Sequence, residues 1–288
     1  MGYLHINNLY KDQTILMFKE CYALEKIHGT SAHIGWNAKE QKVLFFSGGE
    51  KHDRFIQLFD ADFLKQKLSE TFVTSHITIY GEAYGGKQQG MSATYGKELK
   101  FIAFDVQVGE YWLDVPKAEE ICKSLNIEFV HYEKVPTDLV SLDAQRDADS
   151  TQAIRNGCGE GKIREGVVLK PLIELTINNG RRIVAKHKRD EFKETKTPRP
   201  VNPEEFKILT DAQAIADEWV TEMRLKHVLD KLPIDTNIEG TGMVIKAMIE
   251  DVYREAKGEI VENKIVEKCI GSKTAIMFKK YLQSTLLK

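Results

Sequence analysis

Strand-like patterns dominate the first two thirds of the chain. Short runs of apolar and β-branched residues end at glycine, serine or other turn residues, which is the pattern of β-strands bounded by turns. Between the last two runs, the sequence Asn-Asn-Gly has the chemistry of a hairpin turn. The pattern predicts strands at residues 31–36, 43–46, 71–80, 100–106, 166–171, 175–177 and 183–188, with the hairpin turn at 178–180.

Two segments of this part have helical spacing instead. Apolar residues between Asp53 and Leu68 recur every three or four positions, so one helix is predicted there. Residues 115–125 repeat the pattern, with Pro116 in the first turn, where proline is tolerated. Strands and helices therefore share this part of the chain.

The last third of the chain is helical throughout. Three of the seven prolines fall between residues 197 and 203, which indicates a linker, and every apolar pattern beyond them has helical spacing. We therefore predict an α+β fold with two domains. The expected parts are an N-terminal domain of antiparallel sheets with helices at 1–196, a proline-rich linker at 197–203 and a small all-α domain at 204–288.

Composition narrows the class of protein. Of the 288 residues, 42% are hydrophobic and 29% are charged, as in an ordinary globular protein. No apolar run approaches the roughly 20 residues of a membrane span, and the N-terminus lacks the pattern of a signal peptide. The four cysteines form no CxxC pair, which fits reduced thiols. We expect a soluble cytoplasmic protein with no membrane partner.

Charge gives one local signal. The formal net charge of −2 excludes a global cationic field, so any nucleic-acid function must rest on a local patch. Taken alone, such a patch is also typical of a solvated hairpin edge that discourages aggregation. The candidate patch consists of Arg181, Arg182, Lys186, Lys188 and Arg189.

The candidate chemistry centres on Lys26, in the sequence LEKIHGTS at residues 24–31. A lysine three residues before a glycine is weak evidence alone, because Lys87 and Gly90 repeat it. The specific signal is the order of further motifs along the chain. These are Glu82 after Gly81, Phe104-Asp105 at the end of a strand, EGVVLK at 165–170, and the pair Lys186 and Lys188.

In order and spacing, these motifs resemble those of the covalent nucleotidyltransferases, and among them the phage-type RNA ligases that seal nicks in duplex RNA. EKIHGT resembles their nucleophile motif, with His28 where DNA ligases usually carry Asp. The resemblance covers roughly residues 20–190, whereas the helical tail resembles the family only in size and character. It implies a monomeric, ATP-dependent RNA ligase that uses Mg²⁺ or Mn²⁺. Its expected substrate is RNA with 3′-hydroxyl and 5′-phosphate ends, in a nicked duplex.

The resemblance also implies a role for each motif residue. Lys26 is the expected nucleophile, Glu25 reads the adenine edge, Glu82 accepts from a ribose hydroxyl and Phe104 stacks on adenine. Each also has a structural alternative, such as a surface carboxylate or a core aromatic. The expected ATP-binding residues are Leu24, Glu25, Lys26, Ile27, Gly29, Ser31, Ser47, Glu82, Phe104, Lys186 and Lys188, and the expected metal ligands are Glu165 and Asp105.

Physical chemistry gives the lysine motif a rationale. An unperturbed lysine, with a pKa of ~10.4, is only about 0.1% neutral near pH 7.5 and is a poor nucleophile. Cationic partners and a divalent metal around Lys26 would lower its pKa. Lys186 and Lys188, two apart on a strand, point to one face and would contact triphosphate oxygens. Gly29 lets the backbone lie close to a nucleotide.

Two positions depart from the phage-type pattern. Ser31 stands where those enzymes carry Asn, so part of the phosphate network is expected to differ. The strand at 43–46 ends in Ser47-Gly48-Gly49, without the Arg of their next motif. Arg54 is close in sequence, but nothing in the sequence shows that it substitutes. These departures concern substrate handling more than adenylylation.

Two alternatives stay open at this point. A guanylyltransferase of the mRNA-capping type shares the lysine chemistry, although capping enzymes normally append a β-barrel and this chain has a helical tail. A catalytically silent RNA-binding relative would share the fold, although nearly every expected catalytic position is filled. Transfer of label from α-labelled ATP or GTP to the protein separates all three.

Overall fold

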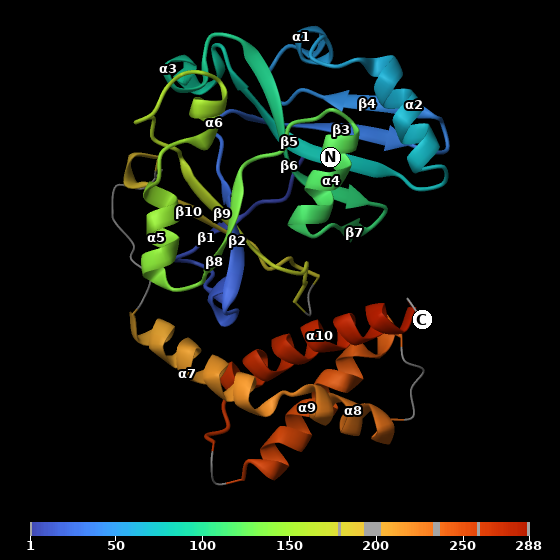
Figure 1. Ribbon diagram of the computed structural model, residues 1–288, viewed down its shortest axis with the longest axis vertical. Helices are drawn as coiled ribbons and strands as arrows, with labels where there is room; N and C mark the ends of the chain where they lie inside the picture. The colour runs from blue at the N-terminus through green and yellow to red at the C-terminus, as the bar shows by residue number, and fades with distance from the viewer. Residues whose placement is uncertain (1, 178–179, 193–202, 233–236, 258–259, 287–288) are drawn as a thin grey trace. The chain divides into compact units, whose positions relative to one another are not determined.

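The chain divides into two units. The computed structural model describes residues 2–177, 180–192, 203–232, 237–257 and 260–286 (Figure 1). One unit comprises Met1–Ile15 and Glu20–Arg199, and the other comprises Leu16–Lys19 and Pro200–Lys288. The predicted linker at 197–203 lies, apart from Pro203, outside the described residues. The domain bounds therefore stay a prediction, whereas the mixed α+β class is confirmed.

The first sheet brings three chain segments together at one end. Strand β2 (Glu20–Glu25) ends at Glu25, which pairs with Val167 at the start of β9 (Gly166–Pro171), and Gly166 pairs with Lys188 at the end of β10 (Ala185–Lys188). Because these neighbours run antiparallel, the residues around those ends converge. The parallel pairing of β1 with β10 departs from the all-antiparallel prediction. The sheet order is β1 (Asn7–Asn8), β10 (Ala185–Lys188), β9 (Gly166–Pro171), β2 (Glu20–Glu25) and β8 (Tyr132–Pro136).

The second sheet has one covered face. Ala32, Ile34 and Trp36 alternate along β3 and pack into a core with Phe55 and Leu64 from the helices over this face. The alternate residues of the strands, such as Ser31 and His33, therefore lie on the opposite face. All neighbours are antiparallel, in the order β4 (Lys42–Phe46), β3 (Thr30–Asn37), β5 (Ile77–Gly85), β6 (Leu99–Val108) and β7 (Tyr111–Trp112).

The helices of this unit correct two predictions. The single helix predicted at 53–68 is wrong, because the Asp60 side chain accepts from the Phe63 amide at 2.9 Å and starts a new helix. That helix continues to Thr71, so β5 begins at Ile77 rather than at residue 71. The helices are α1 (His52–Ile56), α2 (Ala61–Thr71), α3 (Ser92–Tyr95), α4 (Val115–Ser124), α5 (Leu139–Asp147) and α6 (Thr151–Arg155), with short 3-10 turns at Thr14–Met17, Gln88–Gly90 and Asp190–Phe192.

The second unit is helical and has a core of its own. Val244, Met248, Ile270 and Phe278 are buried in this core, and so is Met17 from the N-terminal part of the chain. Among the described residues, no helix has the length and apolar character needed to cross a membrane. The helices are α7 (Pro203–Trp219), α8 (Glu222–Lys231), α9 (Thr241–Glu255) and α10 (Lys264–Leu286), with a 3-10 turn at Ile238–Gly240.

Candidate active site

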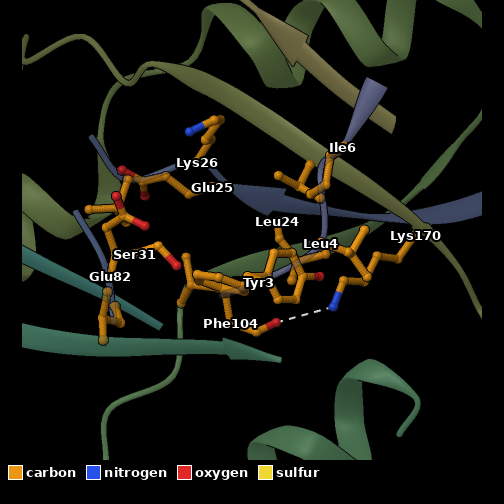
Figure 2. Close-up of a pocket in the computed structure, with 14 residues that line it drawn as sticks. Tyr3, Leu4, Ile6, Leu24, Glu25, Lys26, Ser31, Glu82, Phe104 and Lys170 are labelled. Carbon is orange, nitrogen blue, oxygen red and sulfur yellow. Dashed lines mark hydrogen bonds between the residues drawn. The ribbon is translucent and has the colours of Figure 1, made fainter. Parts of the chain in front are cut away.

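A pocket of about 190 Å³ lies among residues from both sheets and from the N-terminal segment. Figure 2 shows Lys26 and Glu25 near one side and Phe104 beside Tyr3. Seven of the residues expected to bind ATP line it. They are Leu24, Glu25, Lys26, Ile27, Ser31, Glu82 and Phe104.

The pocket-lining residue Lys26 belongs to a charged cluster where β2, β9 and β10 converge. Its Nζ lies 2.9 Å from Glu165 Oε2, and His28 Nδ1 lies 3.0 Å from the same oxygen. Lys188 Nζ lies 2.8 Å from Glu165 Oε1. Burial alone raises the pKa of Glu165, but the His28 hydrogen bond, the charge of Lys26 and the Lys188 hydrogen bond outweigh burial and bring it to about 2. Glu165 is therefore ionised at any physiological pH.

Gly29 and Glu82 fix the backbone after the nucleophile motif. The Gly29 amide donates to Glu82 Oε1 at 3.1 Å. A Cβ at Gly29 would lie 2.4 Å from the Ala83 carbonyl oxygen, so only glycine fits there. Burial raises the pKa of Glu82 to about 7, with the charge of Lys26 acting against it. Glu82 is thus poised between a neutral acid and a carboxylate near neutral pH.

A β-bulge positions Phe104. Tyr80 pairs with Asp105 and Gly81 pairs with Ala103, so Phe104 is the extra residue of β6. Bulges of this kind re-aim a side chain, and here the Phe104 ring lines the pocket. The Tyr3 ring meets it edge-on at 4.9 Å. Lys170 Nζ donates to the Phe104 carbonyl oxygen at 3.2 Å, the dashed line in Figure 2.

The structure does not support Asp105 as a metal ligand. Asp105 is fully buried, and its Oδ2 lies 2.8 Å from Lys170 Nζ and 2.7 Å from Arg182 Nη1. The same oxygen accepts from the Tyr3 hydroxyl at 2.6 Å. Burial raises the pKa of Asp105, but the two cations outweigh burial and hold it below its usual range. Both cationic partners of Asp105 are themselves buried, whereas Lys26, which contacts Glu165, has a side chain that is 24% exposed, and Glu174 pairs with Arg182 beside Asp105.

The side chain of Glu25 also differs from its expected role. Its carboxylate accepts from Ser150 Oγ at 2.5 Å and from the Gln152 amide at 3.2 Å, at the start of α6. Glu25 is 3% exposed and lines the pocket, while its oxygens accept hydrogen bonds from a side-chain hydroxyl and a backbone amide of the protein itself. To read the adenine edge, the Glu25 carboxylate would have to accept hydrogen bonds from adenine in addition to those from Ser150 and Gln152.

Ser47 and Lys186 are not among the pocket-lining residues. The Ser47 hydroxyl donates to the Glu50 carbonyl oxygen at 2.8 Å, inside the turn after β4. Lys186 lies two residues before Lys188 on β10 and therefore on the same face of that strand. The structure thus brings Lys188 to the charged cluster directly, whereas the role of Lys186 stays a prediction.

The predicted basic patch at 181–189 is divided among several acidic partners. Arg182 is 5% exposed and contacts Asp105 and Glu174, whereas Arg181 contacts Asp12. The segment is therefore neither wholly solvated nor a continuous cationic surface. Arg182 and Lys188 carry buried charges, whereas Arg181 is exposed.

Sequence patterns missed the N-terminal wall of the pocket. Tyr3, Leu4 and Ile6 line it together with Ile102 and Val130. Tyr3, Leu4 and Ile6 belong to no motif and to no predicted helix or strand. Among the residues that the structure describes, no three His, Cys, Asp or Glu side chains gather into a group suited to a metal ion.

The comparison with protein families decides the broad class of the chain. The model of the RNA ligase family matches residues 19–188, more than half of the sequence. The chain belongs to the RNA ligase family. The matched region contains every residue expected at the site, from Leu24 to Lys188, and stops before the helical unit. The predicted RNA ligase family is thereby confirmed, whereas the phage-type nick-sealing subtype stays a prediction.

The chain also has distant similarity to solved structures. A search of curated proteins finds no match. The chain is similar to Naegleria gruberi RNA ligase with PPi at 16% identity, with a TM-score of 0.48, covering 67% of this chain and 57% of that one. A variant of the same ligase with AMP and Mn has 15% identity and a TM-score of 0.48, with the same coverage. The chain spans a little over half the length of these ligases.

Proposed function

We propose that the protein is an ATP-dependent RNA ligase that joins 3′-hydroxyl and 5′-phosphate ends through a covalent lysyl-AMP on Lys26. The observation that carries the proposal is the juxtaposition of Lys26 with Glu165 and Lys188 beside a pocket that also contains Phe104 and Glu82. An aromatic ring can stack on adenine, and a carboxylate can accept a hydrogen bond from ribose. A nucleophile with cationic neighbours can react with the phosphates.

The proposed reaction has three nucleotidyl transfers. In the first, Lys26 Nζ attacks the α-phosphorus of ATP, a P–N bond forms and pyrophosphate leaves. The proton of the attacking nitrogen passes to solvent, because Glu165, with a pKa of about 2, is too weak a base to hold it. In the second, an RNA 5′-phosphate takes AMP and frees the lysine. In the third, a 3′-hydroxyl displaces AMP and forms the phosphodiester.

Lys188 and the pocket residues supply position and charge. Lys188 lies next to Glu165 and, as a cation, would neutralise oxygens of the departing pyrophosphate. Phe104 would stack on adenine, an interaction worth ~1–3 kcal/mol per base in nucleic-acid complexes. Glu82, when ionised, would accept from a ribose hydroxyl.

The chemistry of Glu165 fits a divalent metal. It is an ionised carboxylate in contact with the pocket-lining Lys26, and Mg²⁺ is usually held by one or two carboxylates, several waters and substrate phosphates. Bound there, Mg²⁺ or Mn²⁺ would neutralise phosphate charge during transfer. Lys26 and Lys188 would then exchange part of their contact with Glu165 for contact with the nucleotide.

Substrate preference and cellular setting are parts of the same proposal. We propose nicked duplex RNA as the substrate, RNA repair as the setting, a monomer as the active form and the cytoplasm as the location. The phage-type motif EKIHGT supports the nick preference. Ser31 lines the pocket without the Asn expected there, so its phosphate contacts are proposed to differ.

Covalent labelling tests the proposal. The protein is incubated with α-labelled ATP or GTP and Mg²⁺, denatured, and analysed for label on the chain. We expect label from ATP, acid-labile as a phosphoramidate is, and none on Lys26→Ala. Lys87→Ala, at an exposed lysine that also precedes a glycine by three residues, is the matched control and labels normally. Labelling from GTP alone would favour a capping-type guanylyltransferase, and no labelling would favour a silent relative.

A further inference from the structure

Strand β4, at the edge of the second sheet, exposes two large apolar side chains. Leu44 is 45% exposed and Phe46 is 43% exposed, whereas Val43 and Phe45 point to the core side. Natural edge strands usually carry charged residues, because an apolar edge invites aggregation. An apolar pair kept on an edge strand therefore indicates a binding surface.

A row of aromatic rings joins this edge to the nucleotide pocket. Phe46 stacks on His33, with ring centroids 4.8 Å apart and planes 19° apart. His33 contacts Tyr80 at 5.4 Å, and Tyr80 contacts Tyr3 at 5.1 Å. Tyr3 in turn meets Phe104, the ring proposed to stack on adenine, at 4.9 Å. Phe46 is the exposed outer end of this row.

The row and the pocket share one face of the sheet. Ser31, a pocket residue, lies two positions before His33 on β3 and pairs with Glu82, another pocket residue. Side chains two apart on a strand lie on the same face, about 7 Å apart. A polynucleotide end whose terminal phosphate reaches the pocket would thus pass over His33 and Phe46.

We propose that Phe46, backed by His33, is a stacking platform for an RNA base next to the break. This inference rests on the ligase function proposed above. Aromatic rings on a sheet face are a common device for holding unstacked RNA bases. Residues 47–49, Ser-Gly-Gly, supply no cation beside Phe46, so the local chemistry suits a base rather than a phosphate. Two adjacent apolar side chains are also too small for a standard protein interface, which buries about 800 Å² per partner.

RNA binding by the full-length protein tests the platform. Fluorescence anisotropy without ATP measures affinity for a labelled nicked RNA duplex. We expect Phe46→Ala to weaken binding about 5- to 150-fold, the range of base stacking on an aromatic ring. Phe46→Tyr, which keeps the ring, should stay within twofold of wild type. Tyr111→Ala, at an aromatic residue of the same sheet that is 76% exposed, is the matched control and should not change affinity.

A scan of abasic substrates identifies the base that stacks on Phe46. For wild type, removal of one particular base beside the break should weaken binding, and Phe46→Ala should be insensitive to that same removal. Affinity of Phe46→Ala within twofold of wild type, or equal sensitivity at every abasic position, would overturn the platform. A change of oligomeric state in Phe46→Ala would overturn it in favour of a protein contact. Absence of lysyl-AMP on wild type contradicts the ligase function instead, so the two failures are distinguishable.

Discussion

Lys26 and Glu165 are 139 residues apart in the sequence, yet Lys26 Nζ and Glu165 Oε2 are 2.9 Å apart. The antiparallel register produces this contact, because β2 ends where β9 begins. Lys188 reaches the other oxygen of the same carboxylate from the end of β10. Three strand ends therefore assemble a nucleophile, an anion and a second cation at one place.

Removal of the charged partners should impair lysyl-AMP formation. We expect Glu165→Ala, Lys188→Ala and Lys186→Ala each to slow labelling, with the first two slowed by about 10²–10³-fold, the range for loss of one electrostatic contact in a transition state. Single-turnover labelling at sub-saturating ATP and Mg²⁺ measures the effect. Lys87→Ala is the control. Wild-type rates in all three variants would show that these residues do not share a site.

Glu82 should make stability depend on pH. Burial raises its pKa from an ordinary 4.5 to about 7, so the folded state holds the proton more tightly than the unfolded chain. Its contribution is fully present below pH 4.5 and is lost as pH rises through 7. We expect Glu82→Gln, which can still accept from Gly29, to gain stability relative to wild type between pH 5 and 8, by up to about 3 kcal/mol.

Urea unfolding of both proteins across this pH range measures the gain. Glu40→Gln, at an exposed glutamate, controls for the loss of one negative charge. A constant difference between Glu82→Gln and wild type from pH 5 to 8 would mean that the carboxyl titrates outside this window.

The sequence motifs located the candidate site residues better than they located the residues that surround the site. The strand at 166–171 and the helix at 115–125 were predictable because their local patterns agree with the final fold. Asp60 shows the limit of periodicity, since the apolar spacing runs on while the side chain caps a new helix. Tyr3 shows a second limit, because a residue outside every motif becomes a pocket wall only through tertiary contact.

Charged residues were the hardest to interpret from the sequence. Asp105 and Arg182 looked like a metal ligand and part of a surface patch, but they are partners in one buried pair. Their burial depends on a contact between β6 and the segment before β10, and local sequence does not reveal contacts between distant segments.

Asp105 should support the fold rather than bind metal. Asp105→Asn leaves Lys170 and Arg182 buried with one negative charge fewer, and loss of one partner of a buried ion pair typically costs about 3–5 kcal/mol. Urea unfolding measures this loss, with Asp62→Asn, at an exposed position, as the control. An unchanged unfolding free energy, together with a raised Mg²⁺ requirement for labelling, would restore the metal-ligand role.

Removal of the helical unit should separate AMP uptake by Lys26 from the sealing of RNA. The pocket residues all precede residue 203, so a chain ending at residue 202 should still take up AMP on Lys26. RNA affinity grows with the number of phosphates contacted, and the tail would add several contacts. Its basic residues include Arg224, Lys226, Lys231, Lys279 and Lys280.

We therefore expect the shortened chain to label normally and to seal a nicked RNA duplex poorly. Met17 belongs to the core of the helical unit, so thermal unfolding of the shortened chain is measured first to verify that it folds. Sealing equal to that of the full chain would show that the tail does not hold RNA. A folded, soluble chain that takes up no AMP would show that the adenylylation unit extends past residue 202, because the missing helices would then be needed for chemistry at Lys26.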